Sequence, residues 1–172
     1  MTLDIRNIED VKEKMLILNK EFELYGLVNN AGIGCFGRFS DSSDQDADNL
    51  LSTNVLVTLQ MTKAILPYLE TNGSGLVLNI ISKSGLEGKK DEALFSTTEF
   101  AIRGFTESMQ KEYEGTDIRF IAAFIPEMNT PFWEAHPNKK ENRSQLSEPK
   151  DVAHEIMNQL NEDKMVISIS NS

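Results

Sequence analysis

Two patterns of hydrophobic and polar positions alternate along the chain. Short apolar runs at 24–28, 76–81 and 118–125 are bounded by turn residues, which is typical of buried parallel strands. Around these runs, apolar residues are spaced as on helices, and residues 165–169 alternate apolar with small side chains as a final strand does. This alternation of strand-like and helix-like segments predicts an α/β fold.

Four stretches are expected to be helical, and local signals mark their ends. Asn7 can cap the first helix, and Pro149 opens the last one, which runs to about residue 160. The long stretch from about 46 to 69 is expected to bend or break near its middle. A further helix is expected over 92–114. Three apolar residues are expected on its buried side: Phe100, Phe105 and Met109.

The chain shows no internal repeat, low-complexity tract or linker, so we expect a single domain over residues 1–172. The segment 127–148 is polar and irregular, with Phe132 and Trp133 as isolated apolar residues. These two side chains fit either of two roles, lining a substrate pocket or holding a loop in place. The two histidines, His136 and His154, are expected on the solvated surface.

Composition narrows the classes of function. The 172 residues carry a formal net charge of −10, and so acidic a surface argues against binding to nucleic acid or to an anionic membrane. The single cysteine excludes an intrachain disulfide and fits a reducing, cytoplasmic location. No Cys/His cluster has zinc spacing, so no metal site is expected. The charged N-terminus does not fit a signal peptide, and no apolar run reaches the ~18 residues of a membrane span.

Candidate functional positions follow the predicted strands in a fixed order. The tetrapeptide 29–32 (Asn-Asn-Ala-Gly) follows the first apolar run, where its glycine permits a tight strand exit. Asn54 lies within the long helical stretch, Ser82 ends the next strand, and Gly85 and the pair 104–105 (Gly-Phe) come after it. In this order and spacing, the segments resemble the short-chain dehydrogenase/reductase family over nearly the whole chain.

The resemblance implies roles for the polar residues. In the family, an Asn at the place of Asn54 organises a water of the proton relay, and a Ser at the place of Ser82 binds the substrate carbonyl or hydroxyl. A Tyr-x-x-x-Lys pair stands 13 and 17 residues after that Ser, and those places hold Phe95 and Glu99 in this chain. The catalytic positions are thus Asn54 and Ser82, with Phe95 and Glu99 in place of the Tyr and Lys.

The resemblance also implies a cofactor, NAD or NADP, on a Rossmann-type doubly wound parallel sheet. Its remnant contacts fall at Asp4 and Ile5 and at Asn30, Ala31 and Gly32 on the adenine side, and at Pro126 and Thr130 beside the nicotinamide carboxamide. In that last loop Glu127 replaces the usual glycine, and the spacing is one residue short.

Compared with the family pattern, the chain lacks the Gly-x-x-x-Gly-x-Gly turn that holds the cofactor pyrophosphate. Met1 falls at about the end of the family's third strand. We therefore expect a partial Rossmann sheet, truncated at its N-terminus, with residues 24–28 as an edge strand. Since an apolar edge strand invites pairing, we expect a homo-oligomer or pairing with an intact relative.

The two replaced residues decide the functional expectation. Phe95 keeps a ring without its hydroxyl, and Glu99 puts an anion where the family has a cation. Because general acid–base catalysis contributes roughly 10²–10⁴ in rate, we expect a catalytically inactive or severely impaired homologue of an NAD(P)-dependent oxidoreductase, of undetermined substrate.

Two alternatives stay open. One is an active oxidoreductase that takes its phosphate site from a partner chain and uses another proton donor, such as Ser82 through Asn54. The other is a non-enzymatic interaction protein that dimerises through the long helices 46–69 and 92–114.

Overall fold

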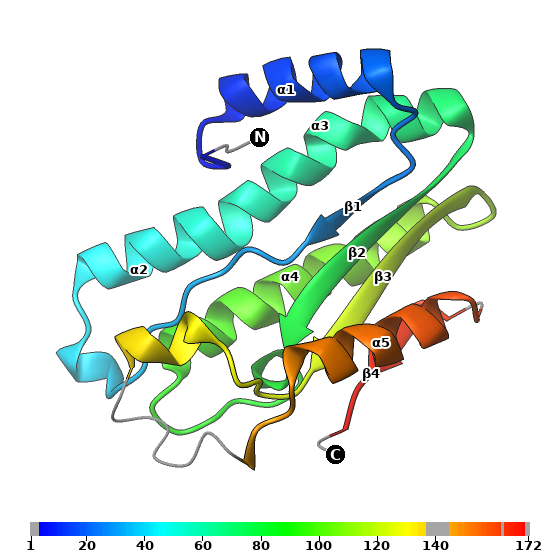
Figure 1. Cartoon of the computed structure of the whole chain (residues 1–172). Helices are drawn as coiled ribbons and strands as arrows, with labels where there is room; N and C mark the ends of the chain where they lie inside the picture. The colour runs from blue at the N-terminus through cyan, green and yellow to red at the C-terminus, as the bar shows by residue number, and fades with distance from the viewer. Residues whose placement is uncertain (1–3, 137–144, 163, 171–172) are drawn as a thin grey trace.

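The computed structural model describes residues 4–136, 145–162 and 164–170. Four strands form one parallel sheet in the order β1-β2-β3-β4, so strands that follow one another in the chain are also neighbours in space (Figure 1). Their bounds are β1 Gly26–Asn29, β2 Ser74–Ser82, β3 Asp117–Ile125 and β4 Val166–Ser168. The predicted α/β fold with a parallel sheet is confirmed, and β1 lies at an edge as expected.

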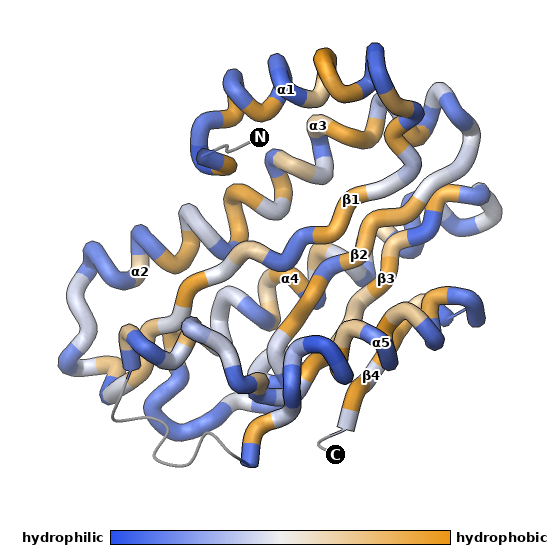
Figure 2. The backbone as a smooth tube through the Cα atoms, viewed as in Figure 1, coloured by the Kyte–Doolittle hydropathy of each residue, from blue (hydrophilic) through white to orange (hydrophobic). Residues whose placement is uncertain are grey.

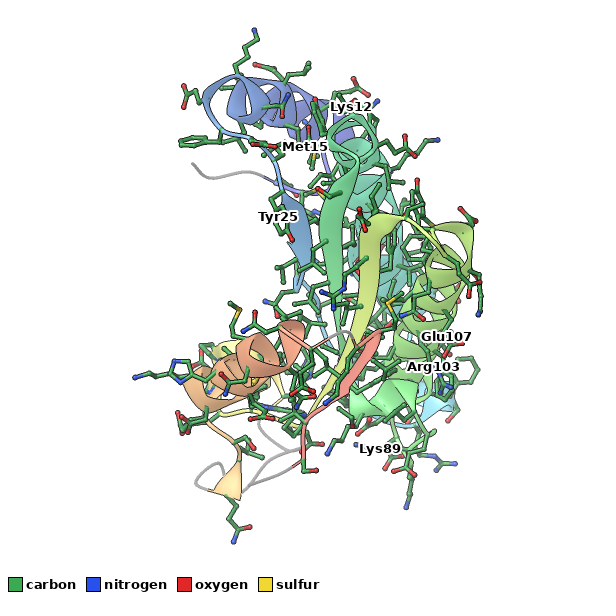
Figure 3. All side chains as sticks on the ribbon, turned by 90° about the vertical axis from the view of Figure 1, so that its right-hand side faces the viewer. Lys12, Met15, Tyr25, Lys89, Arg103 and Glu107 are labelled. Atoms are coloured by element: carbon green, nitrogen blue, oxygen red, sulfur yellow. The ribbon has the colours of Figure 1, made fainter. Side chains whose placement is uncertain are left out.

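Helices cover both faces of the sheet. Helices α3 (Val57–Asn72) and α4 (Ala93–Glu112) pack on one face, and α5 (Pro149–Leu160) packs on the other, as Figure 3 shows with the sheet between α4 and α5. Helix α1 (Ile8–Glu21) lies against α3. The expected cap is present, because the Asn7 side chain accepts a hydrogen bond from the backbone N–H of Asp10.

The core divides into two layers because successive strand residues point to opposite faces. Val77 and Phe120 pack under α1, α3 and α4, whereas their neighbours Leu78 and Ile121 pack under α5. Burial on both faces explains why β2 and β3 read as nearly continuous apolar runs, which Figure 2 shows as largely orange strands beneath helices of mixed colour.

The expected break in the long helical stretch lies at residues 51–56. Helix α2 (Asp44–Leu50) begins at a capping box formed by Ser43 and Asp46, and a π-helical segment, Leu51–Leu56, joins it to α3. π-Helical turns within α-helices often accompany functional sites. Here the π-helical segment contains Asn54, whose side chain is buried.

The expectation for α4 was wrong in one residue. Phe100 is 41% exposed, and the guanidinium of Arg103 lies 6.0 Å from the centre of its ring. The buried stripe passes instead through Ile102, Thr106 and Met109. These residues are three or four apart and therefore share one side of the helix, whereas Phe100 points away from it.

Candidate functional site

A cavity of about 430 Å³ opens where β1, β2 and β3 end. The carboxyl ends of parallel strands lie at one edge of the sheet, so the segments that follow them in sequence meet there. Asn29 and Asn30 come from the end of β1, Ser82 from the end of β2, and Pro126 from just after β3. The π-helical segment and the first turns of α4 complete the wall.

The structure brings nearly all of the expected site residues to this cavity. The expected residues that line the cavity are Asn30, Ala31, Gly32, Asn54, Ser82, Phe95, Glu99, Pro126 and Thr130. Asp4 and Ile5 do not line it. They lie in a turn before α1, where the Asp4 carboxylate pairs with Arg6 at 2.9 Å. They lie in a turn and not at the end of a strand, because no strand of the described sheet precedes β1.

Asn54 joins three parts of the site. Its side-chain Nδ2 donates to the Ile33 carbonyl at 2.9 Å and to Thr98 Oγ1 at 3.1 Å, and its Oδ1 accepts from the Ile33 N–H at 2.9 Å. This one side chain therefore ties the loop after β1 to the π-helical segment and to α4. Asn54 is only 5% exposed, and its three hydrogen bonds hold the walls of the site together.

Phe95 and Glu99 occupy the expected catalytic positions, and Glu99 is acidic and partly buried. Phe95 and Glu99 lie one turn apart on α4 and both face the cavity. The backbone N–H of Ser82 donates to Glu99 Oε2 at 2.5 Å. Burial raises the pKa of Glu99 to about 7, and the hydrogen bond from Ser82 opposes part of that rise. The carboxyl is therefore divided between its two protonation states near neutral pH.

A second carboxyl, Glu92, was missed in the sequence. Ser82 Oγ donates to Ser84 Oγ at 3.2 Å, and Ser84 Oγ donates to Glu92 Oε2 at 2.7 Å. Glu92 is only 4% exposed and lines the cavity. A signal was available, because Glu92, Phe95 and Glu99 are spaced three and four apart and so share a helix face.

Aromatic rings form another wall. Phe36 lies 5.3 Å from Phe95 and 5.5 Å from Trp133 between ring centres, and Phe132 lies 5.0 Å from Trp133. All four rings line the cavity, and Trp133 Nε1 also donates to the Met128 carbonyl at 3.0 Å, so the structure shows both lining of a pocket and anchoring of the loop. Of the two histidines expected at the surface, His154 is exposed, whereas His136 is partly exposed and its ring lies edge-on to Phe36 at 4.8 Å.

Among the described residues that line the cavity, every charged side chain is acidic. Three carboxylates, those of Glu92, Glu99 and Glu127, face the cavity, and no Lys, Arg or His from the described ranges lines it. Of these, Glu127 pairs with Lys89 at 3.9 Å. Within the described residues, no group of three or more His, Cys, Asp or Glu is placed to hold a metal ion.

The family model described as short chain dehydrogenase matches residues 1–141. A 3-ketodihydrosphingosine reductase from Bacteroides thetaiotaomicron is 26% identical over 133 residues, which are 77% of this chain and 49% of that protein. A sepiapterin reductase from Chlorobaculum tepidum is 29% identical over 137 residues, 77% of this chain and 55% of that protein. The chain thus spans about half the length of these curated relatives.

Solved structures agree with the fold. ElxO with NADP bound is 27% identical with a TM-score of 0.86, and a tyrosine-to-phenylalanine variant of ElxO with NADPH bound is 28% identical with the same score. Each comparison covers 98% of this chain and 75% of the other. In the part of the chain that the structure describes, no helix is both long enough and apolar enough to cross a membrane.

Proposed function

The chain belongs to the short-chain dehydrogenase/reductase family, and on that premise we propose that it is an oxidoreductase homologue with lost or severely impaired proton transfer. The observation that carries this proposal is the chemistry of the α4 face. Phe95 presents a ring without a hydroxyl, and Glu99 holds a carboxyl against the Ser82 backbone. No described lining residue supplies the cation that would lower the pKa of a proton donor.

Ser82 is the remaining hydroxyl of the expected catalytic set. Its Oγ donates toward Ser84 and accepts from the Ser84 N–H at 3.2 Å, and Ser84 in turn donates to Glu92. A route for a proton therefore leads from Ser82 toward a buried carboxyl. An alternative proton donor of this kind is the one observation that favours residual activity, and it predicts that Ser82→Ala abolishes any turnover that is found.

The cofactor is NAD or NADP by resemblance, and the ElxO structures support that class, one of them with phenylalanine in place of a tyrosine. A missing hydroxyl alone is thus compatible with NADPH binding in a relative. Glu99 is a stronger obstacle, since it puts an acidic group where the family has a cation and the cofactor itself is anionic. The described lining residues therefore do not fit an anionic dinucleotide.

The test is cofactor binding and turnover on the same purified chain. Calorimetry with NAD(H) and NADP(H) is expected to show no binding at millimolar cofactor. Assays of NADPH and NADH oxidation should include 3-ketodihydrosphingosine and sepiapterin, the substrate types in the relatives' names. Rates are expected to lie at least roughly 10²–10⁴ below those of ordinary reductases. Micromolar cofactor binding together with ordinary turnover would overturn the proposal.

A second candidate function is pairing, with another copy of the chain or with an intact relative. Two surfaces favour it. In the described sheet β1 pairs only with β2, and Val28 is 58% exposed. On the helical side, Leu51, Leu56 and Phe100 are exposed on elements that contact one another. Sedimentation is expected to show a dimer or larger species, and a monomer at high protein concentration would refute this candidate.

A further inference from the structure

We propose that the cavity at the ends of β1, β2 and β3 binds an organic cation, an ammonium group attached to an apolar body of about the size of a benzyl group. The proposal concerns equilibrium binding by the free chain. It therefore goes beyond the proposed function and holds whether or not the chain turns over a substrate.

The anionic group that would receive the ammonium is Glu99. Its Oε2 accepts the Ser82 N–H, whereas no residue of the described ranges donates a hydrogen bond to Oε1. The side chain lines the cavity and is only partly exposed. A carboxylate held away from water in this way is stabilised by a cation that approaches its free oxygen.

The other two acidic residues of the cavity have partners of their own. Glu127 pairs with Lys89 at 3.9 Å, and Glu92 accepts a hydrogen bond from Ser84 Oγ at 2.7 Å. The preference for positive charge is therefore set by Glu99, and no cationic side chain from the described residues lines the cavity beside it.

The aromatic wall favours the same class of ligand. Phe95 stands one helical turn from Glu99, which places a ring next to the carboxyl, and Phe36, Phe132 and Trp133 extend that wall. Phe36 and Trp133 are stacked at 25° between ring planes, whereas Phe132 meets Trp133 edge-on at 84°, so the wall contains differently oriented rings. Ring faces attract ammonium groups and ring edges pack against an apolar body.

The volume sets the size of the ligand. A cavity of about 430 Å³ lies in the lower part of the range of small-molecule sites. That is enough for one aromatic ring with a short cationic substituent. The apolar aromatic wall and the acidic wall meet at Phe95 and Glu99, so a ligand with its charge at one end satisfies both.

The test uses Trp133, the only tryptophan of the chain, as a fluorescent reporter inside the cavity. The probe is benzyltrimethylammonium, whose charge does not change with pH, and the neutral comparison is benzyl alcohol. At pH 8 the cation is expected to bind at least about tenfold more tightly than the alcohol, because a close ion pair near a protein surface is worth that much or more. Equal affinities, or no binding of the cation, overturn the proposal.

Two variants locate the effect. Glu99→Gln keeps the shape and removes the charge, and it is expected to weaken cation binding by about tenfold or more at pH 8 while leaving benzyl alcohol unchanged. The matched control is Glu107→Gln on the same helix, whose carboxylate is exposed and pairs with Arg103 (Figure 3). Phe132→Leu removes an aromatic ring and leaves the charges unchanged. It is expected to lower the affinity for the cation several-fold. An unchanged affinity in Glu99→Gln overturns the assignment.

A pH series adds a readout that needs no variant. Between pH 5.5 and pH 8 the affinity of the wild-type chain for the cation is expected to rise, because the carboxyl of Glu99 ionises in that range. Other charged groups on the neighbouring elements are Glu92 at the N-cap of α4, Arg103 on α4, Lys83 just after β2, and Glu127 and His136 after β3. The Glu99→Gln variant should lose the rise, whereas a rise that persists in it would refute the role of Glu99.

Discussion

The replacement of Glu99 by glutamine is the sharpest test of the site's electrostatics through folding stability. Burial raises the pKa of this carboxyl from its ordinary 4.5 to about 7 in the folded chain. The folded state therefore holds the proton more tightly than the unfolded state. The group's contribution to stability is fully present below pH 4.5, falls as the pH rises, and is lost above about pH 7.

The size of the effect follows from the two pKa values. Their difference corresponds to about 3 kcal/mol between the fully protonated and fully ionised limits. Most of that difference, about 2–3 kcal/mol, falls between pH 5 and pH 8. Glutamine has no charge to desolvate, and its side-chain oxygen can still accept the hydrogen bond from the Ser82 N–H.

The assay is urea unfolding followed by the fluorescence of Trp133, at pH 5 and at pH 8. Relative to the wild type, Glu99→Gln is expected to gain about 2–3 kcal/mol in free energy of unfolding on going from pH 5 to pH 8. The exposed Glu107→Gln is expected to show no such gain. Other titrating groups cancel because both chains contain them. The reasoning is refuted if the difference between wild type and Glu99→Gln is the same at both pH values.

The remaining predictions concern the scaffold. Asn54→Ala removes three hydrogen bonds and leaves buried partners unpaired, so it is expected to lower the free energy of unfolding by about 2–4 kcal/mol, whereas the exposed Asn49→Ala should change it by less than about 0.5 kcal/mol. Gly75→Ala would place a Cβ 2.6 Å from a Leu69 methyl carbon, and is expected to cost about 1–3 kcal/mol. Gly88→Ala, where a Cβ meets nothing within 4 Å, is its control. Urea unfolding measures all four, and a Gly75→Ala chain as stable as Gly88→Ala would contradict the packing at that site.

Local signals in the sequence were enough to predict most elements and most of the site. Asn7 caps α1, Pro149 opens α5, and the apolar runs became β2 and β3, because caps and strand periodicity act over a few neighbouring residues. The spacing from Ser82 to Phe95 and Glu99 placed all three at one cavity, since the helix after a parallel strand begins at the edge of the sheet where that strand ends.

Other features depended on contacts between distant segments. The sequence does not show that Phe100 points outward, that His136 packs on Phe36, or that Asp4 lies outside the cavity. It also does not show how buried a given carboxyl is. These properties depend on which side chains from other elements cover a residue, and helix periodicity alone leaves that rotation undetermined.

Glu99 shows the difference between what the sequence determines and what the tertiary structure determines. The sequence by itself determined that an acidic residue occupies the lysine place of the family pattern. Only the tertiary structure decided the environment of that carboxyl. The end of β2, the loop after β3 and the aromatic wall shield it from water, and Oε2 accepts the Ser82 N–H. Desolvation arises from all of these segments at once, and so the protonation of Glu99 near neutral pH is a property of the fold.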